Sequence, residues 1–234
     1  MSAPPITARL VESREIGPEV RHFVFETVGK DELHFSTGQF VSFSKEIGGK
    51  NITRAYSIAS VPQGNRFDLC LNRVEGGHFS PHLFEMQPGD SVNMKGPLGT
   101  FVWRRPVKPS ILVATGTGIA PFRGMLLEEL ATSNDAPIVL IYGARYASGI
   151  LYRDELEALA ASHPRFDFRP TLTRPDETWQ GRTGRVQKHV YEAIGDSTAF
   201  DVYLCGMKEM IDDIRTTLKA RGFDRKQIIS EKFD

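Results

Sequence analysis

The sequence has few cysteines, no long apolar run and no excess of charge of one sign. Its two cysteines, Cys70 and Cys205, each lie in an apolar segment, LCLNRV and VYLCGM. Such surroundings favour reduced thiols. An iron–sulfur cluster held by protein thiolates alone needs more of them than this chain offers, so the count argues against such a cluster.

The balanced charge and the missing apolar run narrow the range of partners. Lys plus Arg and Asp plus Glu number 29 each, so net charge gives no reason to expect nucleic acid or an anionic membrane. The first segment, MSAPPITARL, has no basic stretch before an apolar one, and no stretch approaches the roughly 18 apolar residues of a membrane span. We expect a soluble, cytoplasmic protein with no membrane or nucleic-acid partner.

The 234 residues are enough for two domains, and the first half has the pattern of strands. Apolar residues alternate in short segments separated by turn residues, which predicts six strands: ITARLVES, RHFVFETV, GQFVSFS, ITRAYSIAS, RFDLCLNRV and SVNMKG. One helix is expected at HFSPHLFEM. Strands at this spacing favour a small antiparallel β-barrel, which we place at residues 1–104.

The second half alternates strands with helices. A connector, WRRPVKPS, holds Pro106 and Pro109, which a central strand does not tolerate. Strand patterns then alternate with amphipathic helices, in the order ILVATG, GIAPFRGMLLEEL, PIVLIYGAR, LYRDELEALAASH, FDFRPTLTR, TGRVQKHVYEAI, DVYLCG, MKEMIDDIRTTLKARG and KQIISEKF. The alternation predicts an α/β domain with a mostly parallel sheet over residues 105–234.

A glycine turn follows the first strand of this second domain. The segment VATGTGIAPFRG, residues 113–124, places Gly116, Thr117 and Gly118 between a buried strand and a helix. Such a turn can bring backbone N–H groups and a helix N-terminus against a phosphate or another polar part of a nucleotide. It is not the G-x-G-x-x-G pattern, and a tight turn that needs glycine only for its geometry explains it equally well.

The strand YLCGMKEM ends in a similar way, at Cys205, Gly206 and Met207. Because the carboxyl ends of parallel strands meet at one edge of a sheet, we expect residues 116–118 and 205–207 on one rim, which is the candidate ligand site. A cysteine in such a run is more often a small buried apolar residue than a catalytic thiol. Only the position of Cys205 at a strand end favours a role for this residue in the ligand site.

In the first domain, GGHFSPHLFEM leads from two glycines into the expected helix. The N–H groups of His78, Phe79 and Ser80, with the Ser80 hydroxyl, can hold a diphosphate; a glycine turn before an ordinary capped helix is the alternative. His78 and His82 are spaced to share one helix face, but no third ligand stands out, so we expect no metal site.

Arg54, in RAYSIAS, is an unusual residue for a strand that only has to pack. Its guanidinium suits the same diphosphate, since arginine offers planar, bidentate and permanently charged recognition. Strand alternation places Tyr56 on the side of Arg54 and Ser57 on the other, unless the strand bends or ends there. A surface ion pair is the alternative role for Arg54.

Together these segments resemble the ferredoxin-NADP reductase family, flavoenzymes with an N-terminal flavin-binding barrel and a C-terminal nicotinamide-binding α/β domain. RAYS is similar to the family's R-x-[YF]-[ST] motif, GGHFS to its diphosphate turn G-x-x-[ST], GTGIAP to its nicotinamide-domain turn, and YLCGMKEM to its C-G-P-x-x-M segment. The four motifs follow the family's order and span nearly the whole chain. Met207 departs from the pattern, since the family usually has proline there.

The resemblance implies a role for the residues of the barrel. Arg54 would contact the FAD diphosphate, Tyr56 would lie against the isoalloxazine and ribityl region, and Ser57 would hydrogen-bond near the hydride-accepting nitrogen. The diphosphate turn favours FAD over FMN. The other FAD-binding residues that it implies are Ala55, Asn72, Val74, Gly77, His78, Phe79, Ser80 and Thr117.

The resemblance also implies catalytic and binding residues in the second half. Cys205 would sit by the nicotinamide ring, with Gly116, Thr117, Gly206 and Met207 as further nucleotide-binding residues. SEKF is similar to the family's Glu-x-aromatic ending. Glu231 would then relay a proton, and the ring of Phe233 would cover the flavin and move aside before hydride transfer. Ser57, Cys205 and Glu231 are the predicted catalytic residues.

The choice between NADPH and NADH depends on what meets the adenosine ribose. An acid accepts a hydrogen bond from a free 2′-hydroxyl, whereas arginines suit a 2′-phosphate. Arg145 ends the strand PIVLIYGAR, no acid follows it before Asp154, and Arg174 and Arg182 can join it. We therefore predict NADPH over NADH. The alternative is that Arg182 is solvated and Arg174 pairs with a carboxylate.

The predicted activity moves electrons between NAD(P)H and a one-electron carrier such as ferredoxin or flavodoxin through bound FAD, in a monomer. Lys45, Lys50, Arg104 and Arg105 are basic residues that can steer an acidic carrier. The same motifs serve reductases of free flavin and of small haem proteins. A non-catalytic flavin-binding electron-transfer subunit of a larger complex is the alternative from another class.

Overall fold

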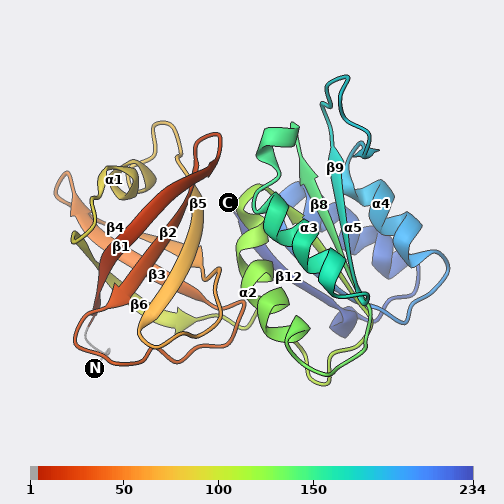
Figure 1. Cartoon of the computed structure of the whole chain (residues 1–234), viewed down its shortest axis with the longest axis horizontal. Helices are drawn as coiled ribbons and strands as arrows, with labels where there is room; N and C mark the ends of the chain where they lie inside the picture. The colour runs from red at the N-terminus through yellow and green to blue at the C-terminus, as the bar shows by residue number, and fades with distance from the viewer. Residues whose placement is uncertain (1–4, 234) are drawn as a thin grey trace. The chain divides into compact units, whose positions relative to one another are not determined.

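The computed structural model describes residues 5–233, which form two compact units (Figure 1). The first unit holds residues 5–102 together with residues 120–128, and the second holds residues 103–119 and 129–233. Within residues 5–233, no helix is both long enough and apolar enough to cross a membrane.

The first unit is the expected antiparallel barrel. Its strands are β1 (Ile6–Gly17), β2 (Val20–Thr27), β3 (Phe40–Ile47), β4 (Lys50–Ser57), β5 (Arg66–Asn72) and β6 (Ser91–Leu98), in the sheet order β4-β3-β6-β1-β2-β5. Neighbouring strands are antiparallel. An isolated bridge between Ile58 and Leu69 joins the two ends of this order and closes the barrel.

Alternation along the strands explains the barrel core. Phe23 and Phe25 of β2 and Phe67 of β5 point inward and are fully buried. The ring centroid of Phe25 lies 5.1 Å from that of Phe43 and 5.8 Å from that of Phe67. Helix α1 (Ser80–Glu85) covers one end of the barrel (Figure 1) and lies where the sequence predicted a helix.

Residues 120–128 belong to helix α2 (Ile119–Leu130) and pack within the first unit. Arg123 donates a hydrogen bond to the carbonyl of Ala59 at 2.8 Å and pairs with Asp68 at 3.1 Å. A side chain on Gly124 would place its Cβ 2.5 Å from the carbonyl oxygen of Ser60, so only glycine permits this approach. Two residues of α2 thus contact the segment that follows β4: Arg123 at Ala59, and Gly124 at Ser60.

The second unit is the expected parallel sheet with helices. The strands are β7 (Ser110–Thr115), β8 (Ile138–Ala144), β9 (Phe166–Leu172), β10 (Arg182–Thr183), β11 (Asp201–Met207) and β12 (Ile228–Phe233). Their order is β10-β9-β8-β7-β11-β12, and every neighbouring pair is parallel. The sequence pattern did not predict β10, because two residues are too few to show alternation.

The helices α3 (Arg153–Ser162), α4 (Val186–Ile194) and α5 (Lys208–Ala220) alternate with these strands as predicted. Apolar side chains of α4 and α5 pack on one face of the sheet, against residues such as Ile111, Val113 and Leu204. Helix α3 lies on the other face beside β9 (Figure 1). Both faces of the strands are therefore buried, which explains their continuous apolar runs.

Glu129, at the end of α2 but in the second unit, is a fully buried carboxylate with several partners. It pairs with Arg105, lies 3.7 Å from Arg165 and accepts a hydrogen bond from Asn134 at 2.8 Å. Its backbone carbonyl also accepts from Arg165 and from Thr132. A buried charge of this kind is tolerated only because its partners compensate for the lost water.

We expect Glu129→Ala to lower the free energy of unfolding by about 3–5 kcal/mol, because it leaves Arg105 and Arg165 without their shared carboxylate. Urea denaturation measures this loss. The matched control is Glu157→Ala, which removes the partner of Arg153 from a half-exposed pair and should cost less than about 1 kcal/mol. Equal losses in the two variants would contradict the assignment of Glu129 as a buried organising charge.

Candidate functional site

Arg54 lies on β4 with an exposed side chain. Its guanidinium donates a hydrogen bond to the carbonyl of the neighbouring Thr53 at 2.8 Å. In the part of the chain that the structure describes, no carboxylate forms an ion pair with it. The surface ion pair weighed as an alternative is therefore not found, and the charge of Arg54 stays available to a ligand.

Tyr56 and Ser57 stand at the end of the same strand. The Tyr56 ring is half-buried, 5.8 Å from the ring of Phe43 and 6.3 Å from that of Phe79. Burial raises the pKa of Tyr56 well above its ordinary value, against the opposing charge of Arg54, so its hydroxyl stays neutral. Strand β4 ends at Ser57, which is buried, while Ala55 is exposed.

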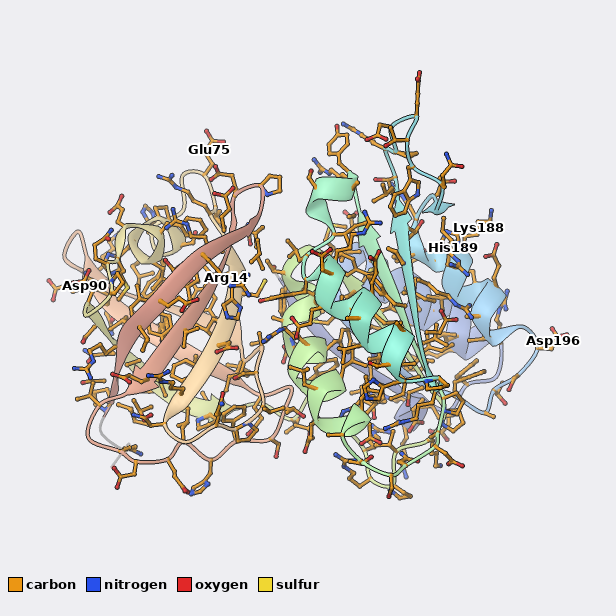
Figure 2. The ribbon with its side chains drawn as sticks, viewed as in Figure 1. Arg14, Glu75, Asp90, Lys188, His189 and Asp196 are labelled. Atoms are coloured by element: carbon orange, nitrogen blue, oxygen red, sulfur yellow. The ribbon has the colours of Figure 1, made fainter. Side chains whose placement is uncertain are left out.

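The turn between β5 and α1 is fixed by Ser80. The Ser80 hydroxyl accepts a hydrogen bond from the Val74 N–H at 2.9 Å, and the Gly77 N–H donates to the Val74 carbonyl at 3.0 Å. A Cβ on Gly77 would lie only 2.9 Å from that carbonyl oxygen. The glycine is thus required by the turn itself, and Glu75 projects outward from the tip of the turn (Figure 2).

The predicted FAD-binding residues around this turn differ in exposure. Asn72, Val74 and His78 are exposed, whereas the side chain of Phe79 is buried in the barrel core. Only the backbone of Phe79 is thus free to meet a ligand. The Ser80 oxygen accepts from the Val74 N–H, which leaves the hydrogen of the hydroxyl to donate to a phosphate oxygen, as the predicted use requires.

In the second unit, the turn after β7 meets the end of β11. Residues Gly116–Gly118 form a single 3₁₀ turn that leads directly into α2. A Cβ on Gly118 would lie 2.4 Å from the carbonyl oxygen of Cys205, so the two chain segments touch. Cys205 pairs in register with Ala114 of β7. The prediction that residues 116–118 and 205–207 share one rim is confirmed.

This rim lies where the strand order changes direction. From β7 the chain builds β8, β9 and β10 to one side, and then returns to add β11 and β12 on the other. Ligands of open α/β sheets bind at such a point. The Thr115 hydroxyl oxygen is buried here and has no hydrogen-bond partner among the described residues, and Thr117 nearby is half-buried.

Cys205 is fully buried, and its neighbours are the predicted catalytic and covering residues. Strand β12 pairs Glu231 with Cys205 and Phe233 with Met207. Burial raises the pKa of the Cys205 thiol well above its ordinary value, and the charge of Glu231 raises it further, so the thiol stays protonated. Met207 is 62% exposed, so the residue that replaces the family's proline presents its side chain to solvent.

The predicted arginines of the second unit are exposed. Arg145 and Arg174 lie in the loops that follow β8 and β9, and Arg182 is the first residue of β10. Arg174 approaches the hydroxyl of Tyr146 at 3.5 Å, and not a carboxylate, while Arg145 precedes Tyr146 directly. The Trp179 indole N–H donates to the carbonyl of Arg182 at 2.9 Å. These contacts order the loop between β9 and β10, while the side chains of Arg174 and Arg182 stay exposed.

Two predicted basic residues have other roles. Arg105 is paired with the buried Glu129, so it is not a free charge for steering a carrier. Lys45 lies 2.9 Å from a ring nitrogen of His82. Among residues 5–233 no three histidine, cysteine or carboxylate side chains are grouped to hold a metal ion.

Sequence reasoning missed Tyr142 of β8. Its ring is fully buried, and its hydroxyl lies 3.0 Å from the carbonyl oxygen of Gly116 and 3.2 Å from that of Gly149. It therefore ties the turn after β7 to the loop that carries Arg145 and Tyr146. The available signal was a lone hydroxyl in the apolar run PIVLIYGAR, because a buried tyrosine needs a partner for its O–H.

Comparison with known proteins identifies both units. Residues 7–103 match the model of the oxidoreductase FAD-binding domain, and residues 112–216 match that of the oxidoreductase NAD-binding domain. The chain is 40% identical to ferredoxin–NADP reductase B of Sorangium cellulosum, with 100% of both chains covered. It is 30% identical to the toluate 1,2-dioxygenase electron transfer component of Pseudomonas putida, covering 97% of this chain and 67% of that protein.

A solved structure agrees with these matches. An Amycolatopsis cytochrome P450 reductase superposes with a TM-score of 0.89 at 27% identity, covering 98% of this chain and 70% of that one. With both domain models matched and a relative similar over its full length, the chain belongs to the ferredoxin-NADP reductase family of FAD- and NAD(P)-binding oxidoreductases.

Proposed function

We propose that this oxidoreductase moves electrons from NADPH through bound FAD to an external one-electron carrier such as ferredoxin or flavodoxin. The observation that carries the proposal is the full-length similarity to a protein named ferredoxin–NADP reductase, combined with intact motif geometry in each unit. The proposed sites are described unit by unit below.

The barrel residues fit an FAD molecule. Arg54 offers a guanidinium without a counterion to the diphosphate, and Tyr56 on the same face offers a ring edge to the isoalloxazine. The turn that Gly77 and Ser80 fix presents N–H groups to the same diphosphate. Ser57, at the strand end, is the proposed hydrogen-bonding residue near the flavin nitrogen that accepts hydride.

The rim of the second unit fits a nicotinamide nucleotide. Gly118 approaches the Cys205 carbonyl so closely that no side chain fits between the two turns of this rim. The partnerless Thr115 hydroxyl is a polar group that this rim leaves unused. Cys205 is proposed to lie beside the nicotinamide ring, where its protonated thiol packs as a neutral group.

Glu231 and Phe233 extend this site along β12. Their register places Glu231 next to Cys205, which supports a role for its carboxylate in holding or relaying a proton there. Phe233, opposite the exposed Met207, is the proposed ring that covers the flavin and moves aside. When bound, FAD supplies the step between two-electron and one-electron chemistry, and these residues orient its partners.

The arginines of the second unit support NADPH over NADH. Arg174 contacts the Tyr146 hydroxyl, and among residues 5–233 it forms no ion pair with a carboxylate, which leaves its charge for a 2′-phosphate. Asp176, an acid of the same loop, accepts hydrogen bonds from the N–H and the hydroxyl of Thr178 through its Oδ1 oxygen.

A haem protein is the second candidate carrier. The chain is 34% identical to NADH-cytochrome b5 reductase 1 of Lodderomyces elongisporus, covering 87% of this chain and 70% of that protein. That relative is named for NADH and a haem carrier. The two candidates differ in both nucleotide and acceptor, so one set of assays separates them.

The purified protein is expected to be yellow and to bleach when NADPH is added without oxygen. Colour should return when an oxidised ferredoxin or flavodoxin is titrated into the same cuvette. Free flavin and cytochrome b5 serve as comparison acceptors. Colourless protein that takes up no FAD would refute the proposed function, and bleaching that only cytochrome b5 reverses would replace the proposed carrier.

Arg54→Ala is expected to weaken FAD retention by about 10- to 100-fold, the value of a hydrogen bond to a charged group. The free energy of unfolding without flavin should change by less than about 0.5 kcal/mol, because the Arg54 side chain bonds only its neighbour. Fluorescence of released flavin measures retention. Arg66→Ala, an exposed arginine of β5, is the control, and full flavin occupancy in Arg54→Ala would contradict the role.

Arg174→Gln is expected to lower kcat/KM for NADPH by about 10- to 100-fold while leaving that for NADH nearly unchanged. The physical reason is the loss of one charged partner of the 2′-phosphate. Arg169→Gln is the control, since Arg169 already pairs with Asp167 at 2.7 Å. Steady-state kinetics with both nucleotides test this, and a wild-type preference for NADH would overturn it.

A further inference from the structure

Two cations stand side by side on one face of the barrel. In the pairing of β3 with β4, Phe43 is opposite Arg54 and Lys45 is opposite Ile52. Lys45 and Arg54 are therefore diagonal neighbours, about 7 Å apart on the same face. Both side chains are exposed, and among residues 5–233 neither forms an ion pair.

A third group, His82 of α1, joins this pair. The Lys45 ammonium lies 2.9 Å from Nε2 of His82, a contact in which an ammonium can only donate. A hydrogen bond from an ammonium requires a neutral imidazole as its acceptor, in agreement with the lowered pKa of His82. The His82 ring also lies 6.3 Å from the Phe79 ring, which itself lies 6.3 Å from Tyr56. Lys45 and His82 therefore extend the surface that Tyr56 and Arg54 form.

The charges around His82 are few. Partial burial lowers its pKa, Lys45 lowers it further, and Glu85 and Asp90 raise it by a smaller effect. Glu85 belongs to the same helix, and Asp90 lies on the outside of the unit, in the loop before β6 (Figure 2). Lys45 and Arg54 therefore form a positive surface beside His82, no described carboxylate pairs with either cation, and a bound anion would reduce their repulsion.

We propose that Lys45 and His82 complete, with Arg54, the binding surface for the FAD diphosphate, and that His82 takes up a proton from solvent when FAD binds. The inference rests on the proposed function, since it names the anion as the diphosphate of that cofactor. It assigns two residues that none of the four sequence motifs includes. Lys45 and His82 become cofactor-binding residues, and flavin affinity becomes dependent on pH.

The direction of the pH effect follows from linkage. Without the anion, Lys45 holds the imidazole neutral; with it, the diphosphate favours the imidazolium and raises its pKa. The binding energy that protonated His82 adds is fully present below the pKa of His82 in the flavin-free protein. It is lost as the pH rises through the pKa of His82 in the FAD complex. FAD should therefore bind more tightly near pH 6 than near pH 8, by up to about tenfold for each pH unit between the two pKa values.

The test titrates the full chain, after reversible removal of flavin, with FAD in a calorimeter. Two buffers of different ionisation enthalpy give both Kd and the number of protons taken up. We expect His82→Gln to abolish proton uptake and to bind FAD about 5- to 10-fold more weakly than wild type near pH 6, with little difference near pH 8. Lys45→Met should move the pH window upward, because it removes a charge that lowers the pKa of His82, and should weaken binding about tenfold at pH values below both windows.

Matched variants exclude other sources of the proton. His34→Gln changes an exposed histidine of the same unit that pairs with Glu32, and it should leave both quantities unchanged. His78→Gln lies in the proposed FAD turn, so its Kd can change, but its proton uptake should remain. If His78→Gln abolishes the uptake, or His82→Gln retains it, the assignment to His82 is wrong.

The outcomes for wild type separate this inference from the proposed function. Tight FAD binding without any proton uptake or pH dependence overturns the inference and leaves the function standing. Binding that depends on Arg54 but not on Lys45 overturns the part assigned to Lys45. Absence of FAD binding under any condition overturns both.

Discussion

The close approach of Gly118 to the carbonyl of Cys205 is the contact on which the second unit's site depends. It joins two turns that lie far apart in the sequence, and it forms only because β7 and β11 are adjacent and in register. Both strands end there, so the turn after β7 and the residues from Cys205 to Met207 face the same rim. Strand β12 extends that rim by bringing Glu231 and Phe233 alongside.

Some cationic side chains pair with carboxylates inside the fold, whereas Lys45 and Arg54 do not. Arg105 and Arg165 share the buried carboxylate of Glu129, and Arg123 pairs with Asp68, so their charges are used inside the fold. Burial raises the pKa of Asp68 while Arg123 opposes the shift, as expected where a carboxylate has one strong partner. Lys45 and Arg54, within the described chain, have no such carboxylate. These two cations lie on the barrel surface that carries the RAYS motif.

The sequence predicted the strands and helices because their periodicities are long and regular. All six barrel strands and the alternation of the second half were visible from the spacing of apolar residues, and the shared rim followed from the rule for parallel sheets. The two-residue strand β10 left no pattern to detect. Side-chain partners were harder, because they depend on register and rotamer.

Three residues have contact partners that the sequence did not predict. Arg105 resembled a free surface charge until its contact with Glu129 appeared. Tyr142 resembled a core ring, although its hydroxyl reaches two loops. His82 was considered from the sequence as a metal ligand, and its contact is with Lys45, 37 positions earlier on another element. Each partner is distant in sequence, so no local pattern announced it.

The closure of the barrel has a consequence for how a ligand finds the strand that carries Arg54, Tyr56 and Ser57. Directly after that strand, the Ile58 N–H donates to Gln39 and the Ala59 N–H donates to Asp68, so successive residues are fastened to opposite neighbours. The strand end therefore has little conformational freedom left to lose. A ligand meeting this surface encounters groups that are already preorganised, and more of its contact energy appears as affinity.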